Sequence, residues 1–327
     1  MAGRGLRCIG PAGRERRQRL LRGGRHLHHR GQAAFARGGA LRRGCADPGG
    51  AVRAQPPVRH REPHRATQRN AHLVTQVQAG AAQARWCLVP RPVAAPRLRL
   101  ICFAYAGGSA DLFRNWVEHL APDVELVAVR LPGRGMRLRE PLYGEWPALV
   151  EDCASALAPY LGEPHALFGH SFGGRLAYEI AQRMRPVLPP GTCRGLFIGG
   201  CRSPDSPQAR PYLHELPEPA FRAALRTMGG TPTEVLEDER LMSLMLPIMR
   251  ADMRLAELWG NWHRTPLDVP LHVYYGHADP IDSEASVAGW RGFTTSGCEL
   301  VGFDGAHFFL DSHREPLLAH MATRLRS

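Results

Sequence analysis

The stretch from Gly169 to Gly174, with the sequence GHSFGG, constrains the fold of this 327-residue chain more than any other. A short apolar run, HALF at residues 165–168, precedes it, and a helical pattern over residues 175–185 follows it. A strand, a sharp turn and a helix in this order are the context in which G-x-S-x-G forms a nucleophile elbow. Such an elbow lifts the serine hydroxyl above the end of a sheet. The motif alone also fits an ordinary Gly/Ser turn, so the rest of the chain must decide.

Apolar runs alternate with helical patterns on both sides of this motif. Strands are expected at residues 97–106, 124–129, 195–199, 271–275 and 299–303, and helices at residues 110–120, 145–161 and from about 316. This alternation predicts an α/β fold with a mostly parallel sheet and helices on both faces. Ligands bind at the carboxyl ends of the strands in such sheets, where the serine motif falls.

Three residues have the order that a catalytic triad requires. A serine nucleophile needs a general base, and the base needs an acid that fixes its tautomer. Behind a nucleophile elbow these partners follow in the order Ser, Asp or Glu, His. Asp279 directly follows the strand at 271–275, and His307 directly follows the strand at 299–303. Alone, each fits an ordinary loop residue, but as an ordered triple Ser171, Asp279 and His307 predict a triad.

Other acidic residues and histidines fit these roles less well. Asp282 lies a turn beyond the strand end, and Asp304 is too close in sequence to the histidine of the triple to reach its ring from the opposite side. His277 precedes the apex of its loop. His313 and His320 fall in the last helical region, where surface positions are expected.

Backbone N–H groups are expected to stabilise the developing oxyanion. One is that of Phe172, the residue after the serine, beside the start of a helix. The second comes from the loop after the first strand, AYAGGS at residues 104–109. This loop lacks the HGGG motif of lipases and esterases, which counts mildly against an enzyme for free esters.

Several motifs in a fixed order extend this pattern. They are CFAYAGGS at 102–109, FRNW at 113–116, LPGRG at 131–135, REP at 139–141, GHSFGG, MGGTP at 228–232, LPIMRAD at 246–252, GHADP at 276–280 and GAHF at 305–308. The series resembles that of type II thioesterases, the discrete editing enzymes of polyketide and nonribosomal peptide synthetase clusters, from residue 86 to the C-terminus. The resemblance implies the α/β-hydrolase fold, the triad Ser171, Asp279 and His307, and Ala106 and Phe172 as oxyanion donors.

The chain departs from the family pattern at three positions. Family members often have Pro or His where this chain has Ala104 and Tyr105, and Met where it has Phe172. These differences affect the entrance and the acyl pocket more than the mechanism.

Residues 203–262 interrupt the alternation of strands and helices and predict a helical lid insertion. Helices are expected at 219–228 and 241–259, and the second is apolar on more than one face and rich in Met. An ordinary buried helix explains this pattern. A lid that lines an adaptable acyl chamber also explains it, because Met is unbranched and fills irregular gaps.

The resemblance implies a thioesterase that hydrolyses aberrant or stalled acyl groups from the phosphopantetheine arm of acyl or peptidyl carrier domains. No metal and no cofactor of its own are expected, since the carrier holds the phosphopantetheine. A carboxylesterase or lipase and a non-catalytic docking module are the alternatives. Arg134, Arg137 and Arg139 are candidates for a basic rim that docks acidic carriers, or they form a solvated face.

Residues 1–85 have a different composition from residues 86–327, the predicted hydrolase domain. They hold 18 Arg and three acidic residues, a charge of +15, which leaves −3 of the total of +12 for the rest. With one aromatic residue and no apolar period, this leader is expected to be disordered. The leader could be an arm that binds nucleic acid, but it lacks aromatic residues for stacking. It could be a transit peptide, but such peptides are usually rich in Ser and the leader has none. A regulatory tail is a third alternative, and we favour non-native sequence from a start assigned too far upstream.

The cysteines and the hydropathy indicate the compartment. The eight cysteines show no C-x-x-C spacing and no zinc-like grouping with His, which is typical of free thiols in a reducing compartment. The sequence has no apolar run of 18 residues and no secretion signal. We therefore expect a cytoplasmic monomer that binds neither nucleic acid nor membranes.

Overall fold

The computed structural model describes residues 84–208, 210–263 and 265–326. All but the last two residues of the predicted leader lie outside the described residues, so the expectation of disorder remains a prediction. Within the described part, no helix is long and apolar enough to cross a membrane. The six described cysteines are free thiols.

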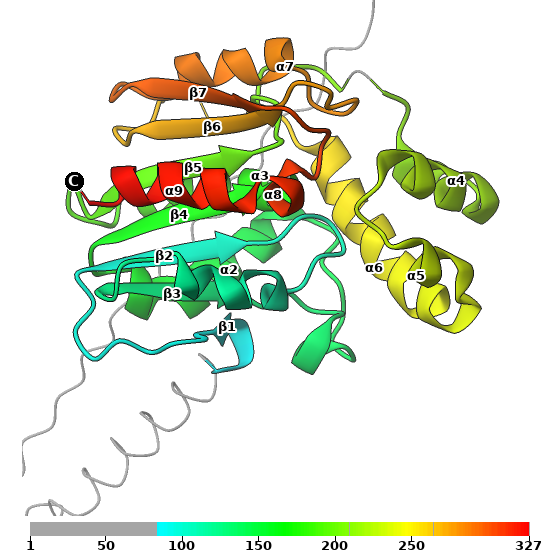
Figure 1. The fold of residues 1–327 in the computed structure, drawn as a ribbon, viewed down its shortest axis with the longest axis horizontal. Coiled ribbons are helices and arrows are strands. Elements are labelled where there is room, and N and C mark those ends of the chain that lie inside the picture. Colours follow the sequence, from blue (N-terminus) through cyan, green and yellow to red (C-terminus); the bar gives the residue numbers. More distant parts are fainter. Residues whose placement is uncertain (1–83, 209, 264, 327) are drawn as a thin grey trace, which may run out of the picture. The chain divides into compact units, whose positions relative to one another are not determined.

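Seven strands form one sheet in the order β1-β3-β2-β4-β5-β6-β7 (Figure 1). The strands are β1 (Cys87–Leu88), β2 (Leu98–Phe103), β3 (Val124–Val129), β4 (His165–His170), β5 (Cys193–Gly199), β6 (Leu271–Gly276) and β7 (Cys298–Phe303). Neighbouring strands are parallel, except that β1 pairs antiparallel with β3 at the edge. The predicted mostly parallel sheet is confirmed.

Helices cover both faces of the sheet. One face packs against η1 (Ala110–Glu118), α8 (Phe309–Ser312) and α9 (Arg314–Arg324). The other face packs against α2 (Trp146–Leu161), α3 (Phe172–Met184), α7 (Glu284–Ala288) and η4 (Gly289–Phe293). Successive strand side chains serve the two layers in turn, because a strand alternates its faces. Ile101, for example, lies in the layer of α2 and α3, and Leu100 and Cys102 lie in the layer of η1 and α9.

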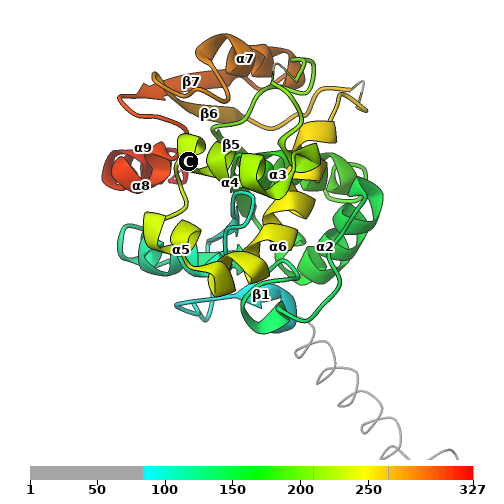
Figure 2. The ribbon, with the colours of Figure 1, turned by 90° about the vertical axis from the view of Figure 1, so that its right-hand side faces the viewer.

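Three helices of the predicted lid lie beyond the carboxyl ends of the parallel strands (Figure 1, at the right). They are α4 (Glu218–Met228), α5 (Thr233–Glu237) and α6 (Glu239–Leu258). Figure 2 shows them from the front, with α6 running across the end of the sheet. Two short 3-10 turns complete the described elements: η2 (Gly135–Arg137) and η3 (Leu213–Glu215).

The lid has an apolar cluster of its own, to which Phe221, Leu236, Met242, Leu246 and Met253 contribute. Helix α6 contributes one buried stripe to this cluster, with the i, i+4, i+7 spacing of a helix face: Met242, Leu246, Met249 and Met253. Leu241 and Leu244 of the same helix are 43% and 55% exposed. The first two turns of the helix are therefore covered on one side only, whereas farther along Ile248 and Leu255, on another side, are buried as well.

Candidate active site

Ser171 sits in a sharp turn between β4 and α3. Its φ of 54° and ψ of −116° make it the one residue other than glycine with a positive φ in the described ranges. A residue in such a region costs about 1–3 kcal/mol and persists only when its surroundings enforce it. Here the Ser171 N–H donates to the carbonyl of Gly199 at 2.7 Å, which fixes the turn above β5. The geometry is that of a nucleophile elbow.

The glycines around the serine allow the backbone segments to touch. A Cβ on Gly169 would overlap the carbonyl of Gly173, and a Cβ on Gly173 would overlap the carbonyl of Phe103 at the end of β2. Helix α3 therefore begins in direct backbone contact with two strands. Any larger residue at either position would displace the serine.

Asp279 and His307 meet at the ends of two neighbouring parallel strands, β6 and β7. Nδ1 of His307 lies 2.8 Å from Oδ2 of Asp279, and the two side chains are 2% and 0% exposed. The other carboxylate oxygen accepts from the N–H groups of Ile281 at 2.7 Å and Asp282 at 3.1 Å. Burial alone would raise the pKa of Asp279, but the hydrogen bonds from His307 and the backbone outweigh it and lower the pKa. An ionised Asp279 accepts a hydrogen bond from Nδ1–H, which leaves Nε2 of His307 as the acceptor.

Ser171, His307 and Ala106 line one cavity of about 50 Å³. The structure thus brings the serine and the histidine together with one expected oxyanion residue. The side chain of Phe172 is fully buried and points elsewhere, with its ring 5.6 Å from that of Trp146. Its N–H is the first of α3, where helix geometry offers no partner within the helix.

A larger cavity of about 300 Å³ adjoins this one and shares Tyr105, Ala106, Met228, Met253 and Phe308 with it. Met245 and Met249 of α6 add to its wall. Helices of the lid thus form one side of the cavity and the loop after β2 forms the other. An apolar, Met-lined space beside the serine suits a flexible hydrocarbon chain.

Comparisons with known proteins agree with this geometry. The family model of the thioesterase domain matches residues 98–325. The chain belongs to the thioesterase family. The predicted family, α/β-hydrolase fold and thioester-hydrolysing function are confirmed.

Solved structures and a curated relative resemble this thioesterase over most of their own length. RedJ, a thioesterase from the prodiginine pathway of Streptomyces coelicolor, is 40% identical with a TM-score of 0.66 and covers 72% of this chain and 91% of its own. BorB, a type II thioesterase from the borrelidin cluster, is 31% identical with a TM-score of 0.67 and covers 73% and 97%. The protein named linear gramicidin dehydrogenase LgrE of Brevibacillus parabrevis is 35% identical over 74% of this chain and 93% of its own.

A second histidine of the thioesterase, His170, packs against His307 with a ring distance of 5.2 Å. It is fully buried, and neither ring nitrogen has a hydrogen-bond partner among the described residues. Burial lowers the pKa of His170 well below its usual value, so the ring is neutral. Nothing in the sequence indicates a role for His170, because the x positions of G-x-S-x-G carry no chemical signature.

Two of the three arginines considered for a docking rim are buried, so that prediction is wrong for them. Arg134 is 9% exposed and pairs with Asp252 of α6. Arg137 is 3% exposed, pairs with Glu140 and lies 3.8 Å from the centre of the Trp86 ring. Arg139 is exposed and remains a candidate. The sequence could not reveal this, since the groups that cover the two arginines come from distant segments.

The residues that competed for the triad roles lie outside the dyad. Asp282 is buried 3.7 Å from Arg175 and reaches the dyad only through its backbone N–H. Asp304 is exposed. His313 and His320, expected at the surface, are both half-buried, and Nδ1 of His320 lies 3.0 Å from the hydroxyl of Tyr274.

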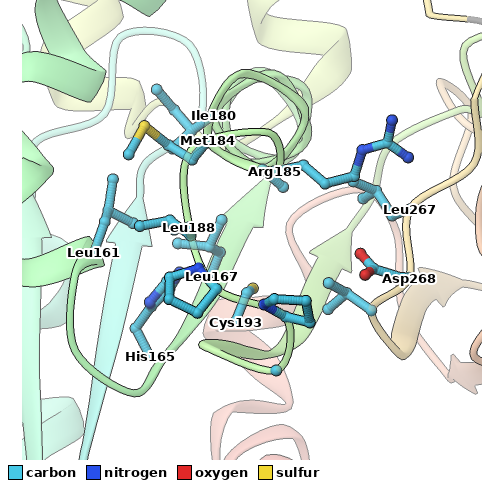
Figure 3. A pocket seen from close by; sticks show the side chains of 15 residues that line it. Leu161, His165, Leu167, Ile180, Met184, Arg185, Leu188, Cys193, Leu267 and Asp268 are labelled. Atoms are coloured by element: carbon cyan, nitrogen blue, oxygen red, sulfur yellow. The ribbon is translucent and has the colours of Figure 1, made fainter.

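Other pockets of the thioesterase lie apart from the serine, and two of them adjoin α3. Figure 3 shows a cavity of about 50 Å³ where His165 and Cys193 begin β4 and β5, at the opposite end of the strands. A larger pocket of about 530 Å³ lies between α2, α3 and α6, with Trp146, Leu255 and Trp262 in its wall. Neither contains Ser171 or His307. In the described part of the chain, no group of three or more His, Cys, Asp or Glu could hold a metal ion.

Proposed function

We propose that this thioesterase releases acyl groups from the phosphopantetheine arm of acyl or peptidyl carrier domains, with Ser171 as nucleophile, His307 as base and Asp279 as the acid that orients it. The buried 2.8 Å contact between Asp279 and His307, beside a serine in a strained elbow, is the observation that carries the proposal. The same three groups perform acyl transfer on several unrelated folds.

Acylation begins when the Ser171 hydroxyl attacks the thioester carbonyl and passes its proton to Nε2 of His307. The N–H groups of Ala106 and Phe172 stabilise the oxyanion that develops, aided by the positive end of α3. The tetrahedral intermediate then expels the pantetheine thiol, which takes the proton back from His307. Because a thiolate is a good leaving group, little is asked of His307 as an acid.

Deacylation repeats these steps with water. His307 accepts a proton from the water molecule that attacks the acyl-serine ester, and the free acid leaves as Ser171 regains its proton. Asp279 stays ionised throughout, because its lowered pKa keeps it charged at neutral pH. It stabilises the imidazolium that forms in each half-reaction.

The substrate class is supported by the cavity and by the relatives. RedJ and BorB are named as thioesterases of the prodiginine and borrelidin pathways. The Met-lined cavity provides a place for the acyl chain next to the serine. The carrier would supply the phosphopantetheine, so the enzyme would need no cofactor, and it would act as a cytoplasmic monomer.

The test compares hydrolysis of acyl-carrier thioesters with that of matched oxoesters by the full-length protein. We expect the thioester to be the better substrate and Ser171→Ala to lower kcat by at least about 10³. Ser243→Ala, at an exposed position on α6, serves as control. Full turnover by Ser171→Ala would remove the mechanism, and a preference for oxoesters would favour an esterase. Light scattering of the purified protein tests the monomer.

A further inference from the structure

A buried ion pair connects the lid to the body of the domain beside the active site. Asp252 of α6 accepts two hydrogen bonds from the guanidinium of Arg134, from Nη1 at 2.6 Å to Oδ2 and from Nη2 at 2.9 Å to Oδ1. The two side chains are 9% (Arg134) and 7% (Asp252) exposed. Arg134 lies on the loop after β3, and the partners are 118 positions apart. The pair therefore exists only when α6 is docked.

The same two side chains hold the backbone of the loop that contains Ala106. The N–H of Gly107 donates to Oδ2 of Asp252 at 2.8 Å, and Nη1 of Arg134 donates to the carbonyl of Gly108 at 3.2 Å. Gly107 has a φ of +76°, which glycine adopts without strain. The backbone directly after Ala106 is thus fixed at two points.

Stability alone explains this arrangement poorly. Burying two charges costs desolvation energy that their attraction often only just offsets, and apolar side chains of similar size are frequently as stabilising. A backbone N–H held in one direction, however, needs an acceptor that an apolar side chain lacks. The ion pair provides that acceptor at the position where the loop passes the serine.

We propose that Asp252 and Arg134 are positioning residues for the oxyanion hole. They hold the Gly107 peptide so that the N–H of Ala106 faces the atom that becomes the oxyanion, and they make this alignment depend on the docking of α6. The proposal rests on the proposed function, because it takes the Ala106 N–H as an oxyanion donor. Such a donor works only at about 2.7–3.1 Å from the developing charge, so a small rotation of the loop is costly.

The contacts of α6 with this loop link the oxyanion hole to the position of the lid. A Cβ on Gly107 would lie 2.9 Å from Cγ of Met249, so α6 also packs directly on the loop. A movement of α6 that widens the Met-lined cavity would withdraw Asp252 from Gly107. The oxyanion hole is then complete only with the lid closed over the acyl chain.

The test replaces the ion pair by apolar side chains in the full-length protein, as Arg134→Met with Asp252→Leu. We expect only a modest fall in the thermal midpoint, because no unpaired charge remains and only hydrogen bonds of the loop backbone are lost. We expect kcat to fall by about 10², as for the loss of one oxyanion donor, with little change in KM. If the ion pair had a purely structural role, a double variant with nearly the stability of the wild type would also have the kcat of the wild type.

A second measurement reports on the oxyanion directly. A trifluoromethyl ketone with the substrate's acyl chain forms an anionic adduct with the serine, so its Ki should rise by the same factor as kcat falls. The Ki of the free product acid should stay constant. Arg134→Lys keeps a positive charge beside Asp252 and preserves the hydrogen bond from the Gly107 N–H to Asp252, so this variant should retain most activity.

The matched control is Arg99→Met with Glu125→Leu, which removes a half-buried pair at 2.9 Å between β2 and β3, away from the serine, and should leave kcat unchanged. Wild-type kcat in the Arg134/Asp252 double variant, or a fall in kcat without a matching rise in the ketone's Ki, overturns the proposal. If that variant does not fold, Asp252→Glu provides the test, since it keeps the charge but shifts the carboxylate by one methylene. A kcat equal to that of the wild type in Asp252→Glu would then overturn the proposal. Turnover by Ser171→Ala would instead overturn the proposed function.

Discussion

Ser171 holds a strained backbone conformation because close backbone contacts on both sides of the turn enforce it. Gly169 and Gly173 let α3 touch β4 and β2, and the Gly199 carbonyl fixes the Ser171 N–H. In the proposed mechanism the strain has a chemical use, since it presents the hydroxyl above the end of the sheet. The addition of a single methyl group at this turn should therefore have a large effect on stability.

Gly173→Ala should destabilise the fold by about 3 kcal/mol or more, because the new methyl group meets the Phe103 carbonyl, a rigid backbone atom. Thermal unfolding and the rate of labelling by a fluorophosphonate measure the effect. Gly292→Ala is the matched control, since a Cβ there meets nothing within 4 Å. Equal stability of the two variants would show that the turn is not close-packed.

Asp279→Asn should lower kcat by about 10⁴ while the protein stays folded, because the backbone N–H groups of Ile281 and Asp282 hold the amide oxygen and the amide NH2 then donates to Nδ1, which leaves His307 in the wrong tautomer. Steady-state kinetics at neutral pH measure this. Asp304→Asn, at an exposed position three residues before His307, should leave kcat unchanged. Comparable activity of the two variants would remove Asp279 from the mechanism.

At the scale of elements, the helices of the lid form one wall of the cavity beside the active site. Met245, Met249 and Met253 of helix α6 line the 300 Å³ cavity, whereas Leu241 and Leu244 lie in solvent. One side of the helix can thus set the depth of the cavity, and the opposite side has no part in it. Substitutions on the two sides should differ in effect.

Met245→Trp should shift the preferred acyl chain toward shorter lengths, because the larger side chain fills part of the cavity. Each methylene that loses its apolar contact costs about 0.8 kcal/mol, close to fourfold in kcat/KM. A hydrolysis profile over acyl-carrier substrates of graded length measures the shift. Leu244→Trp makes the same substitution at a 55% exposed position and should leave the profile unchanged. An unaltered profile in Met245→Trp would place the acyl chain elsewhere.

At the scale of the whole molecule, the last strands and the last helix are joined at one carboxylate. Glu299 of β7 accepts from Arg324 of α9 at 2.8 and 3.0 Å and lies 3.0 Å from Nδ1 of His272 on β6. The guanidinium of Arg324 outweighs the opposing effect of burial and lowers the pKa of Glu299 to about 2. With 38% of its side chain exposed, Glu299 is partly screened by solvent.

A lowered pKa gives this carboxylate a stabilising effect that depends on pH. The effect is complete above the unfolded value of about 4.5 and is lost as pH falls toward the folded value of about 2. Glu299→Gln should therefore lower the thermal midpoint at neutral pH, and its difference from the wild type should narrow from about pH 5 to about pH 3. Glu315→Gln, at an exposed position on α9, is the control. A difference that does not change with pH would contradict the assignment.

The sequence by itself determined most of the sheet, the elbow and the order of the three residues of the proposed triad. The strand at residues 124–129 has the predicted ends because its residues, five of them apolar, are buried on both faces of the sheet. Asp279 and His307 could be found because the carboxyl ends of parallel strands meet at one edge, so position after a strand predicts position in space. Local signals were too weak for the two-residue β1 and for α5, α7 and α8. Where a helix was expected at residues 110–120, residues 110–118 form a 3-10 helix.

Only the tertiary structure decided which charged residues are buried and what they hold. Arg134 and Arg137 follow a strand in a polar loop, where solvent is the expectation, yet α6 and Trp86 cover them. Asp252 gave one signal, an acidic residue within an apolar helical stripe, but nothing in the sequence named its partner. Periodicity records whether a position faces the interior, whereas the pairing of two charges 118 residues apart depends on how the lid docks.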